Sequence, residues 1–264
     1  MTLSEDTFII FGTGDTLYSE LYISGVKLKQ DIQAEDSYVF SLPCVKNLKQ
    51  LDIDKKVTFF VGENGSGKST LLEAIAVNMG FNAEGGTKNF NFSTADTHSP
   101  LYRYMTVIKG VKRHKDGFFL RAESFYNVAS EIDRLDSEPS FGPPVKMSYG
   151  GKSLHSQSHG ESFMSLVMSK FTGNSLYILD EPEAALSPTR QLSLLIRINE
   201  LVKKGSQFII ATHSPILLAF PDACIYLIGE GGIRPIRYEE TEHYTVTRQF
   251  LNNPQKMLRY LFEE

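Results

Sequence analysis

The stretch Gly62-Glu63-Asn64-Gly65-Ser66-Gly67-Lys68-Ser69-Thr70 matches the phosphate-loop pattern G-x-x-x-x-G-K-[ST]. The segment before it, residues 56–61, is β-branched and aromatic, which is typical of a buried strand. The segment after it, residues 71–76, consists mostly of good helix formers. Because strand, glycine loop and helix in this order are the context that the motif requires, we predict that residues 62–70 bind nucleotide phosphates.

The residue types of this loop suit a triphosphate. Its three glycines allow a sharp turn that brings backbone N–H groups close to phosphate oxygens, and the following helix points its positive end at them. Lys68 can reach the β- and γ-phosphates, the hydroxyl of Ser69 can bind Mg²⁺, and Thr70 adds a hydroxyl near the α-phosphate. We therefore expect ATP and Mg²⁺ as the cofactors.

A second group of polar residues follows two apolar segments downstream. Residues 175–179 are typical of a buried strand and lead into Asp180 and Glu181. Asp180 is expected to hold Mg²⁺ opposite Ser69, and Glu181 to orient or deprotonate the attacking water. Residues 207–212 read as a neighbouring strand, so His213 at its end can contact the γ-phosphate. In isolation, the carboxylate pair would also fit a solvated helix start.

The whole chain has the composition of a globular protein. It has 264 residues, with 41% hydrophobic and 22% charged residues and a net charge of −4, which gives no overall basic field for nucleic acid. The two cysteines, Cys44 and Cys224, form no disulfide or metal pattern. The acidic N-terminus lacks the start of a signal peptide, and no apolar run is long enough to cross a bilayer. These features predict a cytoplasmic protein without membrane insertion.

Strand and helix signals alternate along the chain, which predicts an α/β fold with a mostly parallel sheet. Ser158 and Glu161 have capping-box spacing for a helix start, and Ser187 followed by Pro188 marks another. Further expected elements are strands at 21–23, 37–40 and 117–123, a strand or short helix at 101–110, helices at 124–135 and 250–262, and a hairpin around 229–232. Tyr38 or Phe40 can stack on adenine, although an aromatic residue in a strand more often packs in the core.

Four motifs, in this order, resemble the ATP-binding-cassette class of P-loop ATPases. They are residues 62–70, Ser158-His159-Gly160-Glu161, Asp180-Glu181-Pro182 and His213. Within the class, the chain is similar to the small bacterial predicted ATPases related to SMC and RecF-like proteins, from about residue 40 to the end. The resemblance implies one domain over residues 1–264. It combines a mostly parallel central sheet with an antiparallel β part and a helical signature-segment subdomain at about 81–174.

The resemblance also implies a mechanism that needs two copies of the chain. In such ATPases two ATP molecules lie between head-to-tail subunits, each held by one phosphate loop and the partner's signature segment. Ser158, Gly160 and Glu161 would then bind the nucleotide in trans, with Ser158 and the backbone of Gly160 at the γ-phosphate. ATP would close the homodimer and hydrolysis would open it.

Three positions depart from the pattern of the class. His159 stands where the signature segment has its first glycine. Glu123 is the nearest candidate for the metal-binding Gln that follows the buried strand, so we expect Glu123 as a metal ligand if the positions are equivalent. Ser187 ends the loop after Glu181, where an Asp is usual, and this change weakens the case for communication between the two sites.

We therefore expect an ATPase that dimerises on ATP and drives a conformational switch, in DNA maintenance or in defence. One alternative is a nucleotide-sensing module whose hydrolysis is incidental to binding an unidentified protein partner. Another is the ATPase subunit of a membrane transporter. Nucleic acid remains an open partner that rests on family analogy, because the net charge gives it no support and no heptad-rich insertion exists.

Overall fold

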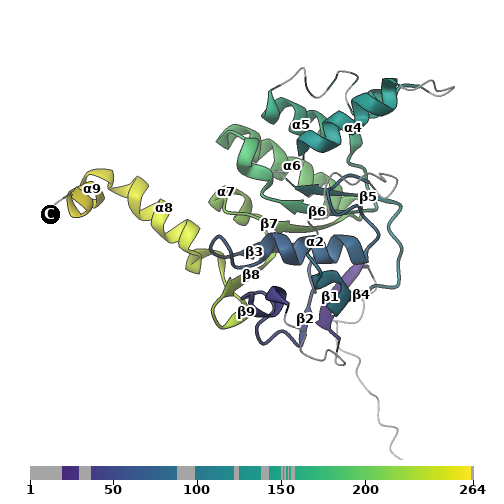
Figure 1. Ribbon diagram of the computed structural model, residues 1–264. Helices are drawn as coiled ribbons and strands as arrows, with labels where there is room; N and C mark the ends of the chain where they lie inside the picture. Colours follow the sequence, from purple (N-terminus) through teal and green to yellow (C-terminus); the bar gives the residue numbers. More distant parts are fainter. Residues whose placement is uncertain are drawn as a thin grey trace, which may run out of the picture.

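The computed structural model describes residues 20–29, 37–87, 99–121, 125–137, 143–149, 151, 153, 155 and 158–262. Within these residues the chain forms two β-sheets with helices packed around them (Figure 1). Glu123, the expected metal ligand, lies outside the described residues.

The central sheet has six strands in the order β5-β6-β7-β3-β8-β9. The first five strands are parallel, and β9 closes the edge as the antiparallel partner of β8. The strands are β5 (Asp116–Arg121), β6 (Ser175–Asp180), β7 (Gln207–Ala211), β3 (Val57–Val61), β8 (Cys224–Gly229) and β9 (Gly232–Pro235). This order places β3, which leads into the phosphate loop, between β7 and β8. The carboxyl ends of β3, β6 and β7 therefore meet at one edge of the sheet.

A second, antiparallel sheet has the order β2-β1-β4. Its strands are β2 (Gln50–Asp52), β1 (Ile23–Leu28) and β4 (Met105–Lys109). The two sheets are tied together by Gln207 of β7, whose side-chain oxygen accepts hydrogen bonds from the backbone N–H groups of Tyr22 (2.8 Å) and Ile23 (2.9 Å). The predicted combination of a mostly parallel sheet with an antiparallel part is confirmed.

Side chains of the central sheet alternate between two hydrophobic cores, as strands buried on both faces require. Phe60, Ile178 and Ile209 pack with α2 (Lys68–Asn78) and the antiparallel sheet, whereas Phe59, Leu179 and Ile210 pack on the other side. That second core is covered by α4 (Phe125–Ser137), α5 (His159–Lys170), α6 (Pro188–Lys203) and α7 (Pro215–Leu218). The short helix α3 (Leu101–Tyr104) packs on α2.

The C-terminal helices α8 (Glu242–Asn252) and α9 (Pro254–Phe262) project away from the body of the protein (Figure 1). Neither helix has a buried residue. Large apolar side chains on them are exposed, among them Leu251 (69%), Leu261 (66%) and Phe262 (75%). Residues at the start of α8 line a cavity together with the loop that follows β3.

Several expected elements differ from those observed. Residues 37–40 form no strand: Tyr38–Ser41 is the 3-10 helix η1, in which only Val39 is buried. The expected strand at 21–23 begins at Ile23 and runs to Leu28, and residues 101–109 hold both a short helix and a strand. The C-terminal helix begins at Glu242 and is interrupted at Asn253, because Pro254 cannot donate the backbone hydrogen bond that would continue α8.

The helices of the expected signature-segment subdomain pack on one another. The 3-10 helix η2 (Val145–Tyr149) contacts both α4 and α5. Within the described residues, every helix is too short or too polar to span a lipid bilayer.

Candidate active site

The phosphate loop joins β3 to α2 as the sequence predicts, with α2 beginning at Lys68. Gly62, Gly65 and Gly67 have φ angles of +153°, +82° and +95°. A side chain at Gly67 would be strained by its φ and would also overlap the Sγ of Cys44. The segment before the loop is fixed against it, because the backbone N–H of Cys44 donates to the carbonyl of Ser66 (3.0 Å). The loop therefore has the glycine-dependent shape that cradles phosphates.

Lys68 is buried, with 4% of its surface exposed, and its Nζ lies inside the loop. It donates to the carbonyl oxygens of Gly62 (2.8 Å) and Glu63 (3.0 Å). Burial lowers the pKa of Lys68, and this effect is opposed by the negative charges of Glu181 and, to a smaller extent, Asp180 and Glu183. The ammonium thus faces both the loop and the carboxylates at the end of β6.

The carboxylates Asp180 and Glu181 sit where β6 ends. Asp180 is 6% exposed and is in register with Ala211 of β7. The N–H of Glu181 donates to the carbonyl of Ala211 (2.9 Å), and Glu181 has φ +50° and ψ +52°. A left-handed conformation is unfavourable for a non-glycine residue and is often found at functional sites. Here it turns the chain sharply between the buried strand and Pro182.

His213 follows β7 and lies beside these carboxylates. Its backbone N–H donates to Oε1 of Glu183 (2.5 Å), and its ring Nε2 lies 3.5 Å from Oε1 of Glu181. Its other ring nitrogen, Nδ1, is hydrogen-bonded to Nε2 of His243 (2.9 Å). The pKa of His243 is lowered by burial and by the neighbouring His213.

Sequence reasoning missed Glu183 and His243. Glu183 lies two residues after Glu181, so its place among the carboxylates at 180–183 could have marked it as a candidate site residue. His243 lies 30 residues beyond His213 on a helix, and nothing in the local sequence marks it. Only the tertiary structure brings these two residues to the strand ends.

A cavity of about 900 Å³ opens beside the phosphate loop. Its walls are residues 62–66, His213, the end of β8, and Thr241, His243 and Val246 from the start of α8. This volume is within the range of small-molecule sites. Among the described residues, the buried Oγ of Ser66 has no hydrogen-bond partner, so a polar group remains available for a ligand there.

The signature segment lies at the start of α5 and does not line that cavity. The predicted capping box is present: the Ser158 N–H donates to the Glu161 carboxylate (3.1 Å), and the Glu161 N–H donates to Oγ of Ser158 (3.4 Å). The hydrogen bond from Ser158 lowers the pKa of Glu161. A Cβ on Gly160 would lie 2.5 Å from the carbonyl oxygen of Ala185, so the close contact with the loop after Glu181 requires glycine.

The expected metal ligands are therefore placed in part. Ser69 is the second residue of α2 and Asp180 ends β6, while the third, Glu123, falls outside the described residues. In the part of the chain that the structure describes, no three His, Cys, Asp or Glu side chains are grouped to hold a metal ion. These residues fit Mg²⁺ that arrives with phosphate oxygens and waters, which is its usual mode of binding to nucleotide enzymes.

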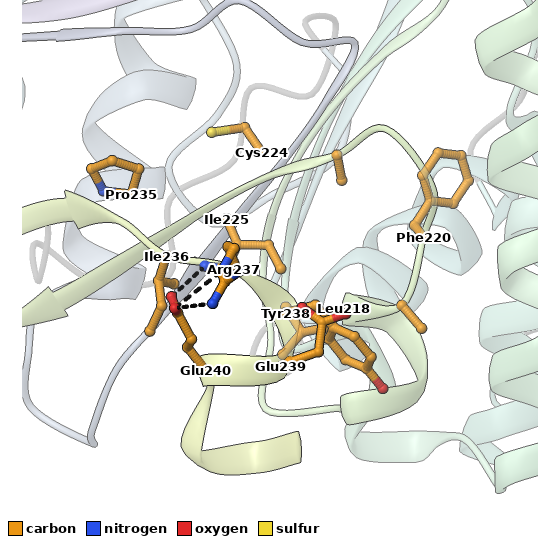
Figure 2. A pocket seen from close by; sticks show the side chains of 12 residues that line it. Leu218, Phe220, Cys224, Ile225, Pro235, Ile236, Arg237, Tyr238, Glu239 and Glu240 are labelled. Carbon is orange, nitrogen blue, oxygen red and sulfur yellow. Dashed lines mark hydrogen bonds and ion pairs between the residues drawn. The ribbon is translucent and has the colours of Figure 1, made fainter. Parts of the chain in front are cut away.

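A second pocket, of about 640 Å³, lies between α7, β8 and the segment after β9 (Figure 2). Arg237 crosses it and forms an ion pair with Glu240 (2.7 Å), so these charges already satisfy each other. The pocket contains none of the predicted site residues. It shares only Ile236 and Glu240 with the cavity at the phosphate loop.

Family models match two overlapping parts of the chain. A model described as an AAA domain matches residues 38–139. A second model, described as an AAA domain, AbiEii toxin, of a type IV toxin–antitoxin system, matches residues 89–219. Together they include the phosphate loop, the signature segment, the carboxylates after β6 and His213.

Known proteins similar to the chain include ATP-binding-cassette proteins. A protein of Caldanaerobacter subterraneus subsp. tengcongensis, named as an ABC transporter ATP-binding protein, is 28% identical over 75% of this chain and 87% of its own length. The ADP-bound structure of an ABC transporter's ATP-binding cassette is 20% identical over 92% of this chain and 98% of that one, with a TM-score of 0.46. The SMC head domain from Thermotoga maritima is 17% identical over 82% of this chain and 100% of that one, with a TM-score of 0.41.

Proposed function

We propose that the chain is a P-loop ATPase of the ATP-binding-cassette type, which hydrolyses ATP at residues 62–70 and Glu181 while two copies close around two nucleotides. The observation that carries the proposal is the convergence of Lys68, Glu181 and His213. Burial lowers the pKa of Lys68, and the nearby charge of Glu181 opposes this lowering, while His213 lies 3.5 Å from the same carboxylate. Three segments that are far apart in the sequence thus meet at one edge of the sheet.

Each residue would have a separate task in hydrolysis. The loop N–H groups and Lys68 would bind the phosphates, where charged oxygens are stronger acceptors for Nζ than its present carbonyl partners. Glu181 would accept a proton from the attacking water, whose oxygen bonds to the γ-phosphorus as the bond to the bridging oxygen breaks, giving ADP and phosphate. His213 would donate a hydrogen bond to the γ-phosphate. Mg²⁺, held by Ser69 and Asp180, would supply positive charge against the phosphates.

A second copy of the chain would complete the site. Ser158 and Glu161 are exposed at the start of α5, outside the cavity that the phosphate loop lines. The α5 N-terminus presents backbone N–H groups that favour an anion. A head-to-tail dimer would place Ser158, Gly160 and Glu161 of one copy against the nucleotide of the other.

The biological setting has two candidates. The similarity to a protein named as an ABC transporter ATP-binding protein favours an ATPase subunit of a transporter. The match to the model described as an AAA domain, AbiEii toxin, favours a role in defence, alone or with a partner protein. Purification from the native host with Mg²⁺ and ATP would separate them: a membrane protein recovered with the chain supports the first, and a non-membrane partner supports the second.

Phosphate release measured for wild type and Glu181→Gln tests the enzyme assignment. We expect Glu181→Gln to lower kcat by about 100-fold or more, since it removes the general base. Its affinity for ATP should stay within about threefold, because the phosphate loop is untouched. Glu200→Gln, on the exposed face of α6, is the matched control and should retain wild-type turnover. Wild-type turnover in Glu181→Gln would overturn the assignment, and tight ATP binding without any hydrolysis by wild type would favour a nucleotide sensor.

A further inference from the structure

We propose that His243 of α8 is a positioning residue for ATP hydrolysis, which holds the imidazole of His213 in the orientation that faces Glu181 and the γ-phosphate. This inference rests on the proposed function and adds a residue outside the four motifs. It also makes the C-terminal helices part of the active site.

The contact between the two histidines is direct. Nδ1 of His213 and Nε2 of His243 are 2.9 Å apart, and the ring centroids are 5.1 Å apart with the planes tilted by 54°. The other nitrogen of His213, Nε2, lies 3.5 Å from Oε1 of Glu181. Glu181, His213 and His243 therefore form a row in which the central ring is bounded on both sides.

The hydrogen-bonding chemistry of this row favours one position for the proton of neutral His213. A neutral imidazole has one N–H and one acceptor nitrogen, and an ionised carboxylate can only accept. The arrangement with Nε2–H of His213 toward Glu181 leaves Nδ1 as the acceptor, so His243 must donate from its Nε2. Because the buried Nε2 of His213 has no hydrogen-bond partner among the described residues, its N–H is free to bind the γ-phosphate. His243 would thus select the tautomer that the reaction needs.

The environment of His243 keeps it in the neutral form that this arrangement uses. Burial lowers its pKa, with further lowering by His213 and Lys68 and an opposing effect from Glu242. Its ring also lines the cavity beside the phosphate loop. With its pKa lowered, His243 is a weaker base than an ordinary histidine, and its neutral ring keeps one N–H that can donate to His213.

The start of α8 is anchored, so His243 is held in place. Thr241 is 1% exposed and caps the helix, with its Oγ1 accepting from the N–H of Tyr244 (3.3 Å). Tyr238, just before it, donates from its hydroxyl to the carbonyl of Pro215 in α7 (2.9 Å). The rest of α8 and α9 extends away from the body (Figure 1). These hydrogen bonds fix the first turn of α8, and they therefore fix the position of His243.

Steady-state ATPase kinetics of His243→Ala, His243→Phe and His243→Gln test the proposal, with His213→Ala as reference. His243→Phe keeps the ring and loses the donor, whereas His243→Gln offers an amide N–H. We expect His243→Ala and His243→Phe to lower kcat about tenfold with KM within about threefold, since the loss of one oriented hydrogen bond acts on the reaction step. His243→Gln should recover most of kcat. Thermal melting of each variant shows that it is folded.

A double-mutant cycle separates positioning from a structural role. If His243 acts through His213, adding His243→Phe to His213→Ala should lower kcat by less than about twofold, because the ring to be positioned is gone. Equal losses in both backgrounds, or wild-type kcat in both His243→Ala and His243→Phe, would overturn the proposal. Wild-type kcat in His213→Ala would instead contradict the role of His213 in the proposed function, so the two failures are distinguishable.

Discussion

Gln207 of β7 exchanges two hydrogen bonds with the backbone of Ile23 of β1, 184 residues earlier. Its Oε1 accepts from the Ile23 N–H (2.9 Å), and its Nε2 donates to the Ile23 carbonyl (2.8 Å). Gln207 is 1% exposed, so both of these bonds are shielded from water. The amide therefore pairs like one more residue of the antiparallel sheet and joins that sheet to the central one.

Replacing Gln207 by Leu should destabilise the protein strongly. It leaves the N–H groups of Tyr22 and Ile23 and the carbonyl of Ile23 buried without their partner. We expect a loss of about 3 kcal/mol in the free energy of unfolding and a fall in Tm of roughly 6 to 12 °C by circular dichroism. Gln207→Glu keeps an oxygen that accepts the two N–H groups, so its Tm should lie between those of wild type and Gln207→Leu. A Gln207→Leu protein that melts within about 2 °C of wild type would show that the tie between the sheets is dispensable.

The phosphate loop makes a graded prediction about glycine. Gly65 and Gly67 both have positive φ, but a Cβ on Gly65 would meet nothing within 4 Å, whereas one on Gly67 would overlap Cys44. Gly65→Ala should therefore cost about 1 kcal/mol of strain, and Gly67→Ala about 1 to 3 kcal/mol more. Chemical denaturation measures the difference.

A second substitution checks the cause of that difference. Gly67→Ala combined with Cys44→Ala should recover part of the extra loss, because the smaller side chain removes the overlap but not the strain in φ. Equal stability of Gly65→Ala and Gly67→Ala would contradict the role of Cys44 beneath the loop.

The two cysteines should differ in reactivity. Cys44 is fully buried, and burial raises its pKa to about 12, whereas Cys224 is half-buried with a smaller rise in pKa from the same cause. At pH 8 a thiol of pKa 12 is about one part in ten thousand thiolate, and alkylation needs the thiolate. Labelling with iodoacetamide at pH 8, read by peptide mass spectrometry, should modify Cys224 well before Cys44. If Cys44 in folded protein is modified as fast as Cys224, the prediction that burial protects the Cys44 thiol is wrong.

Ser158 should affect assembly more than stability. Ser158→Ala removes the cap of α5 and should cost about 1 kcal/mol, and Ser187→Ala, which uncaps α6 in the same way, should cost a similar amount. Only Ser158→Ala should reduce ATP-dependent dimerisation, measured by light scattering, and Ser158→Thr should restore it. Equal effects of Ser158→Ala and Ser187→Ala on dimerisation would show that Ser158 acts only as a helix cap.

The sequence predicts the parts of this fold that depend on local pattern. The strands that carry the site are continuous apolar runs because both faces are buried, and the Ser158 and Ser187 caps are visible in the residues themselves. Residues 37–40 show the limit of such reasoning: their aromatic and β-branched side chains favour a strand, but Tyr38–Ser41 forms a 3-10 helix in which Val39 is buried and Phe40 packs, partly buried, against the core. Tyr38 stays 60% exposed beside the segment that packs on the phosphate loop.

In the candidate site, too, some residues can be predicted from local sequence and others depend on the tertiary structure. The loop at 62–70, Asp180, Glu181 and His213 follow strands whose ends can be read from the sequence. His243 cannot be found in this way, because its contact with His213 depends on how the chain returns after the β8–β9 hairpin. The order of strands in the sheet decides which loops meet, and local pattern does not contain that order.

Sedimentation of Glu181→Gln with MgATP distinguishes a nucleotide site that a second copy completes from one that a single chain forms alone. This variant should bind ATP without turning it over, so any closed dimer should accumulate. We expect a species of about twice the chain mass of 29.7 kDa with one ATP per chain, and a single-chain species without nucleotide or in Lys68→Ala. A protein that binds one ATP per chain and still sediments at 29.7 kDa would contradict the account.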